Sequence, residues 1–108
     1  MRTFSFTDMK GGWFAGPFTP TAFHTEACEV SFKVHSKGEV WPAHYHRIAT
    51  EVNLLVQGSM TICGAEISAG TVFVIEPGEV AAPVFHTDCH IVCVKVPAAR
   101  DDKIITTL

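Results

Sequence analysis

Two histidines and a glutamate in the middle of the chain have the types and spacing of metal ligands. His44 and His46 are separated by one residue, so on an extended strand both side chains lie on the same face. Glu51 follows after a four-residue loop, and in an antiparallel strand its side chain would lie beside the histidine pair. Neutral imidazoles and a carboxylate are suitable ligands for divalent iron, manganese, nickel or zinc. The alternative interpretation is a polar strand end with two surface histidines.

Other polar residues are candidates for contact with a small-molecule ligand at the same site. Alternation from Glu51 places Asn53 and Gln57 on its face, although for Gln57, at the strand end, we favour pairing with the backbone or a neighbouring strand. Lys95 is a candidate contact for an anionic substrate, but we expect it to point outward into solvent. Trp41 falls on the face opposite the histidines, so we expect it to pack against the N-terminal aromatic residues or a second subunit.

The elements that must position these residues are short β-strands. Glycine and proline separate segments rich in Val, Ile, Phe and Thr, and no long stretch has a helical period. The expected strands span residues 28–35, 40–46, 51–57, 59–63, 71–75, 81–86 and 90–96, with an edge strand near 103–107. Short strands at such regular spacing predict an all-β sandwich or barrel.

Composition limits the class of protein further. The 108 residues are 47% hydrophobic with a net charge of -3, which is typical of one domain with one core. The basic residues are scattered, which argues against a nucleic-acid partner, and no apolar run approaches the ~20 residues of a membrane-spanning helix.

The first residues show no signal-peptide pattern, so we expect a cytoplasmic location and reduced thiols at all four cysteines. Cys89 and Cys93 would lie about 13 Å apart on one strand face, and a disulfide requires Cα atoms within about 7 Å. We therefore interpret both as small core residues.

Within this pattern, the segment around the histidines resembles the first conserved motif of the cupins. The motif reads Gly38, five residues, His44-Tyr45-His46, four residues, Glu51, six residues, Gly58. The resemblance covers roughly residues 28–96 and implies a single double-stranded β-helix, or jelly-roll barrel. Residues 1–27 would then form an N-terminal arm, and residues 97–108 a C-terminal tail or edge strand.

The second cupin motif is degraded. Gly70 and Gly78 are in register, but Ala81 stands where cupins usually carry a histidine that is the fourth ligand. The resemblance then implies either a metal held by three residues, with open positions for water or substrate, or a replacement ligand. His86 and His90 are the candidates. Alternation sends His86 outward unless a bulge at Pro83 shifts the phase. His90 faces inward only if the even-numbered residues of its strand do, so we expect both histidines at the surface or in loops.

The resemblance implies a metal-binding cupin that binds or acts on a small polar or carbohydrate-like molecule. Cupins include enzymes and non-catalytic binding modules, so the residues leave open whether this chain is an enzyme. The alternatives are a binding module without catalysis and a structural remnant without metal. Because cupins commonly pair, we also expect a homodimer.

Overall fold

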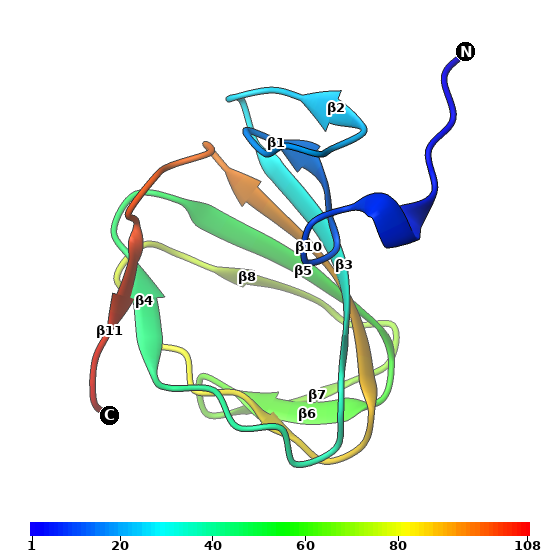
Figure 1. Ribbon diagram of the computed structural model, residues 1–108. Helices are drawn as coiled ribbons and strands as arrows, with labels where there is room; N and C mark the ends of the chain where they lie inside the picture. The colour runs from blue at the N-terminus through cyan, green and yellow to red at the C-terminus, as the bar shows by residue number, and fades with distance from the viewer.

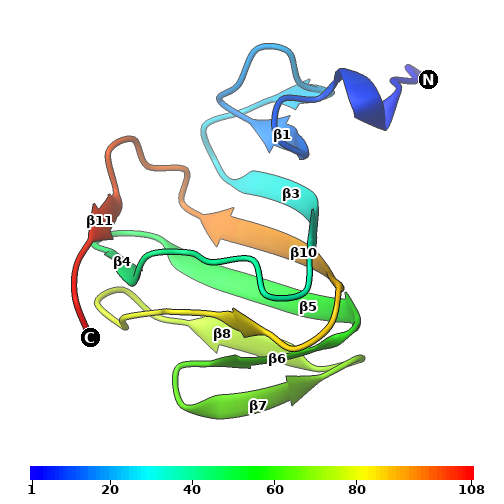
Figure 2. The ribbon, with the colours of Figure 1, turned by 60° about the horizontal axis from the view of Figure 1, so that its bottom comes forward.

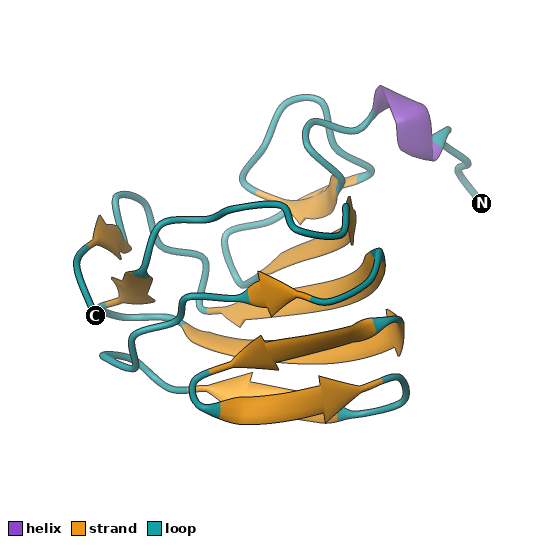
Figure 3. Cartoon of the chain, turned by 90° about the horizontal axis from the view of Figure 1, so that it is seen from below, coloured by secondary structure: helices purple, strands orange, loops and turns teal.

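The computed structural model describes residues 1–108 and consists almost entirely of β-strands, as Figure 3 shows. The helical element is a single 3-10 turn, η1 (Phe6–Asp8), near the N-terminus. The strands are β1 (Trp13–Gly16), β2 (Phe23–His24), β3 (Glu29–His35), β4 (His44–His46), β5 (Thr50–Gln57), β6 (Ser59–Ile62), β7 (Ala65–Ser68), β8 (Val72–Ile75), β9 (Val84–Phe85), β10 (Cys89–Val96) and β11 (Lys103–Ile105). The predicted all-β class is confirmed.

The strands form one large sheet and two small ones. The six-stranded sheet has the order β2-β1-β3-β10-β5-β8, and its long members pair antiparallel. Figure 1 shows the small β7-β6-β9 sheet facing it across the molecule, with the β11-β4 pair along one side. Figure 2 shows the same layers from another direction, with β1 and β3 at the end of the large sheet near the N-terminus. Residues from distant parts of the chain therefore face one interior.

The apolar core occupies only part of that interior. Leu55 on β5 is fully buried, and Met60 on β6 and Phe85 on β9 pack in the same cluster from the opposite sheet. The cluster is completed by Ile62, Ile67, Ile75, Ala81, Cys89 and Ile91. Burying a side chain such as Leu55 contributes about 1.5–3 kcal/mol relative to leaving it exposed, so this cluster supplies much of the stability of the fold.

Two of the predicted strands are shorter than expected. The segment 40–46 is a strand only over His44–His46, and the segment 81–86 only over Val84–Phe85. Each contains a proline, Pro42 or Pro83, which has no N–H to donate to a neighbouring strand. Outside the regular strands, Val40 forms an isolated β-bridge with Val84, and Ala81 forms one with His44.

The sequence did not predict β1, β2 and β7. Strand β7 has a weak signal because alanine and glutamate favour strands poorly. It pairs with β6 through a tight turn at Cys63 and Gly64, which have φ values of 51° and 74°. Positive φ at both central residues is the conformation of a type I′ hairpin turn. The residues expected to form an N-terminal arm contribute β1 and β2 to the large sheet.

The glycine at the end of the first motif has a clear structural role. Gly58 has φ 105°, and a Cβ at this position would lie 2.3 Å from the carbonyl oxygen of Asp88. Only glycine fits a backbone with this conformation and this close approach. The tight turn from β5 to β6 therefore depends on Gly58.

All four cysteines are free, as predicted, and Cys89 and Cys93 are buried. No helix in the structure has the length and hydropathy needed to cross a membrane.

Candidate functional site

A cavity of about 130 Å³ lies on the inner face of the six-stranded sheet, beside the apolar core. Its wall includes three side chains predicted as metal ligands, His44 and His46 from β4 and Glu51 from β5. Asn53, predicted to contact a ligand, also lines the cavity and is buried. Four polar residues chosen from spacing alone therefore share one cavity.

The His44 ring is oriented by the backbone that immediately precedes its strand, β4. Its Nδ1 donates a hydrogen bond to the carbonyl oxygen of Pro42 at 3.1 Å. A carbonyl only accepts, so Nδ1 carries the proton and Nε2 keeps its lone pair. Burial lowers the pKa of His44, which favours the neutral ring. This is the protonation state and tautomer in which Nε2 binds a metal ion.

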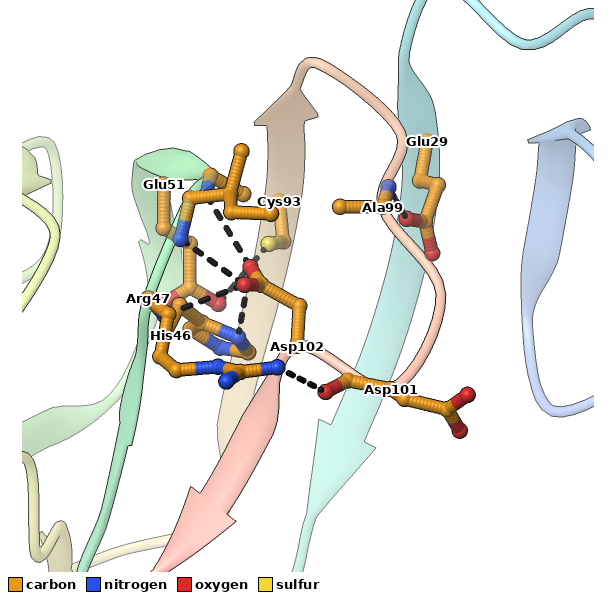
Figure 4. Close-up of polar contacts among 10 residues, drawn as sticks. Glu29, His46, Arg47, Glu51, Cys93, Ala99, Asp101 and Asp102 are labelled. Atoms are coloured by element: carbon orange, nitrogen blue, oxygen red, sulfur yellow. Dashed lines mark hydrogen bonds and ion pairs between the residues drawn. The ribbon is translucent and has the colours of Figure 1, made fainter.

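The His46 ring has a more distant outer partner, the carboxylate of Asp102. His46 is 5% exposed, and its Nδ1 lies 3.7 Å from Asp102 Oδ2 (Figure 4). Burial, followed by the charge of Lys95, lowers the pKa of His46 and favours the neutral imidazole. Histidines that bind metal through one nitrogen usually direct the other to a carboxylate or carbonyl. His44 shows that arrangement as a hydrogen bond, and His46 shows it as a longer contact.

Asp102 also shapes the loop that joins the histidines to Glu51. Its Oδ1 accepts hydrogen bonds from the backbone N–H groups of Arg47 and Ile48, and its Oδ2 accepts one from Ala49 (Figure 4). Burial raises the pKa of Asp102, but these hydrogen bonds outweigh it, so the pKa is lowered overall. The C-terminal segment thereby sets the distance between β4 and the start of β5.

Glu51 faces the cavity from β5 and contacts the neighbouring strand β10. Its Oε1 accepts a hydrogen bond from Cys93 Sγ at 3.1 Å (Figure 4). Burial, and then the negative charge of Glu51, raises the pKa of Cys93 well above its ordinary value, so the thiol keeps its proton and donates. The other oxygen, Oε2, has no hydrogen-bond partner.

This donor set fits a divalent metal ion in its chemistry. It offers two neutral imidazoles with outer partners for Nδ1, and a carboxylate with one oxygen uncommitted. As the side chains stand, however, no three His, Cys, Asp or Glu residues are grouped closely enough to hold an ion together. The centres of the two imidazole rings are 5.6 Å apart, with the rings nearly perpendicular.

Ala81 lies directly opposite His44. Its N–H donates to the carbonyl oxygen of His44 at 2.7 Å, and it accepts the N–H of His44 in return at 3.0 Å. Ala81 is 3% exposed and lines the cavity. The position at which cupins usually carry their fourth ligand is thus beside His44 and holds only a methyl group.

The remaining candidates lie away from the cavity. His86 is exposed, with its Nε2 2.7 Å from Thr61 Oγ1, and His90 packs edge-on against Phe32 on the outer face. Gln57 is exposed at the far end of β5, where it pairs with His90 at a register shift. That irregularity ends the alternation from Glu51 that had placed Gln57 on the inner face.

Two sequence expectations are wrong. Lys95 lines the cavity and does not point outward, because the odd-numbered residues of β10 face the interior. Trp41 also lines the cavity and packs against the apolar core. It lies before β4 begins, so strand alternation does not describe its direction.

Trp41 is positioned through Glu39 on the same loop. The Glu39 carboxylate accepts a hydrogen bond from the Trp41 indole N–H and is in contact with the ring of His35. These two contacts, that of His35 first, lower the pKa of Glu39 to about 2, so Glu39 is ionised at neutral pH. His35 itself stacks on Phe85, with ring centroids 4.5 Å apart.

Sequence reasoning missed one complete wall of the cavity. Ser31, Lys33 and His35 on β3 all line it, and Val34, between the latter two, is exposed on the outside. Polar and apolar residues alternate strictly along this strand. Such a pattern usually indicates that the polar residues face solvent, but here they face the cavity.

No family model and no curated protein sequence matches this chain. Solved structures do match. A Klebsiella pneumoniae protein with a double-stranded β-helix domain has 16% identity and a TM-score of 0.69, over 78% of this chain and 74% of that one. The DMSP lyase DddQ from Ruegeria pomeroyi has 14% identity and a TM-score of 0.68, over 87% of this chain and 49% of the lyase. A variant of Streptomyces PAC13 solved with uridine has 12% identity and a TM-score of 0.64, over 78% of this chain and 71% of PAC13.

Structures of cupins from Bacteroides fragilis and Shewanella frigidimarina also match. The chain therefore has the double-stranded β-helix fold of the cupins, as its sequence predicted. Since all these identities are below 25%, the likeness establishes the fold and carries no particular activity with it.

Proposed function

We propose that this protein is a small-molecule-binding cupin whose cavity holds a divalent metal ion on His44, His46 and Glu51. The observation that carries the proposal is the shared wall of one cavity, in which each histidine has an outer partner for Nδ1. That arrangement leaves both Nε2 atoms for an ion. The three side chains must close on the ion when it binds, because they do not meet as they stand.

The ion would supply Lewis-acid polarisation of a bound oxygen atom. The chain supplies the rest of the site. Asn53 presents a buried amide, and Ala81 leaves the position beside His44 open for an occupant. Phe73 and Trp41 provide an apolar flank. These groups suit a small polar or carbohydrate-like molecule, and the uridine in PAC13 shows that a protein of this fold binds such a ligand.

Metal titration of purified protein tests the proposal. We expect one divalent ion per chain, measured with Zn(II) or Mn(II) by calorimetry, and a loss of more than about 100-fold in affinity for His44→Ala or His46→Ala. The loss exceeds the ~10 to 100-fold typical of outer partners because a direct ligand is removed. His86→Ala is the matched control, since His86 is exposed and outside the cavity. Stoichiometric metal in the double alanine variant would contradict the assignment.

The outer face of the large sheet supports the expected homodimer. It carries two cross-strand rows of apolar residues, Phe32-Val92-Leu54-Val72 and Val30-Val94-Val52-Val74. Val72 and Val74 are 62% and 50% exposed. A continuous apolar face of this kind marks an interaction surface, and we propose that it pairs with a second copy. Sedimentation should give a dimer for the wild type and a monomer for Val74→Glu, and a monomeric wild type would refute the pairing.

A further inference from the structure

The wall of the cavity carries three lysine ammonium groups that form no ion pair with a carboxylate. Lys33 on β3, Lys95 on β10 and Lys103 on β11 all line the cavity. Contacts within 4 Å between a basic nitrogen and a carboxylate oxygen join His35 to Glu39 and His46 to Asp102, and neither involves a lysine. Glu51 is the only carboxylate in the cavity wall. Positive charge therefore exceeds negative charge among the residues that line the cavity.

The carboxylates nearest to Lys95 and Lys103 form no ion pair with either lysine. Glu29, Asp101 and Asp102 lie near Lys95 and Lys103 in an adjoining depression. Asp102 is engaged by three backbone N–H groups, and Glu29 accepts one from Ala99 (Figure 4). Burial, followed by repulsion from Lys95, lowers the pKa of both Lys33 and Lys103. An anion among the lysines would relieve that repulsion.

Two tryptophans hold the lysines in place. The Nζ atoms of Lys33 and Lys95 lie 4.8 and 5.1 Å from the centre of the Trp13 ring, and Lys103 Nζ lies 4.7 Å from the centre of the Trp41 ring. A ring face attracts a cation through its quadrupole but carries no net charge. The ammonium groups are thus positioned without being neutralised, and their charge remains available to a ligand.

The inner wall of the cavity carries polar atoms without partners. Ser31 Oγ and Asn53 Nδ2 are buried and make no hydrogen bond, and both residues lie beside Cys93 on the neighbouring strand β10. Buried polar groups are nearly always hydrogen-bonded. Two unpaired polar atoms in one cavity wall therefore indicate an occupant with acceptor atoms. An amide N–H and a hydroxyl both donate to such an occupant.

We propose that the natural ligand of this cavity is a small organic carboxylate, bound through Lys33, Lys95 and Lys103, with its remaining oxygens directed toward Ser31 and Asn53. This inference deepens the proposed function, because it assumes that the same cavity binds a small molecule. It does not require the metal ion. A neutral sugar could accept hydrogen bonds from Ser31 and Asn53, but it would leave the three ammonium groups without an anionic partner.

Calorimetry with succinate and its neutral isostere succinamide tests the charge preference on the unmodified protein. The titrations are made on protein treated with EDTA. We expect succinate to bind at least about tenfold more tightly than succinamide, with an affinity that falls as salt is raised. Equal affinity for the two compounds, or an affinity independent of salt, would overturn the proposal.

Variants then locate the binding groups. Lys33→Gln and Lys95→Gln should each weaken succinate binding by about tenfold, because each removes a charged hydrogen-bond donor. Lys37→Gln is the matched control, since Lys37 is exposed and outside the cavity. Unfolding curves of all three variants establish that each is folded. A control variant as weak as Lys95→Gln would show that the site lies elsewhere.

The same titrations separate this inference from the metal assignment. His44→Ala should abolish metal binding and leave the preference for succinate over succinamide in place. A protein that binds metal but shows no such preference would refute the carboxylate ligand and leave the metal site standing. A protein with the preference but no metal binding would support the carboxylate ligand and refute the metal site.

Discussion

The inner faces of β5 and β10 each have two ends with opposite character. At one end, Glu51 and Asn53 face Cys93 and Lys95 across the strand pair and line the cavity. At the other end, Leu55 faces Ile91 within the apolar core. Two residues along a strand, or about 7 Å, separate an unpaired amide from a fully buried leucine. The site and the core are therefore built on the same two strands and on the same inward-facing positions. They differ only in the chemistry of the side chains at those positions.

The two ends are also held by different forces. Packing of apolar side chains from both sheets holds the core end. The cavity end is held by hydrogen bonds at its edge. The Asp102 carboxylate accepts them from the backbone of residues 47–49, and the Glu39 carboxylate accepts one from Trp41. A site that must admit a ligand is not filled by its own side chains, so hydrogen bonds around its edge maintain its shape.

The largest contrast should come from shortening one residue at each end of β5. Leu55→Ala should lower the free energy of unfolding by about 3 kcal/mol, because it leaves a cavity in a packed core. Asn53→Ala should cost less than about 1 kcal/mol, since the amide Nδ2 that it removes has no hydrogen-bond partner. Denaturant unfolding of both variants measures the difference. Similar losses would show that the cavity end contributes to stability as the core end does.

A smaller effect is expected when the support of the cavity end is weakened. Asp102→Asn keeps the shape of the side chain but replaces one acceptor of backbone N–H groups with a donor. We expect a loss of about 2 kcal/mol, the scale of a hydrogen bond to a charged group together with an unpaired donor. Asp101→Asn is the control, because Asp101 is exposed at φ 54°, a conformation that asparagine tolerates. Equal unfolding free energies for the two variants would contradict this role of Asp102.

The smallest effect concerns Ala81, where the core meets the site. Ala81→His should tighten Zn(II) or Mn(II) binding by at least tenfold, or about 1.4 kcal/mol, because a fourth ligand would lie beside His44. Ala81→Leu controls for the added volume and should not tighten binding. Unchanged affinity in Ala81→His, with a large loss in His86→Ala, would contradict the three-ligand model.

Local pattern predicted the all-β class, most of the strands and one part of the site. Strand alternation and short spacing predicted that His44, His46 and Glu51 would be neighbours, because only one loop separates them. The register of Gly70 and Gly78 likewise placed Ala81 at the position where cupins usually carry a fourth ligand, and Ala81 lines the cavity. Each of these inferences depends on residues close together in the chain, whose relative positions the geometry of a strand already determines.

The rest of the cavity was decided by tertiary structure. Lys33 and Lys103 reach it from β3 and β11, and Asp102 contacts the backbone of the loop after β4 across more than 50 residues of sequence. Alternation divides a strand into two faces, but it does not say which face is inside. On β3 the polar face points inward, because β3, β10 and β5 of the same sheet together line a cavity and not a dry core. The sequence by itself determined most of the strands and the placement of His44, His46 and Glu51 in one cavity wall, and the arrangement of the sheets around the cavity determined its charge and its remaining lining.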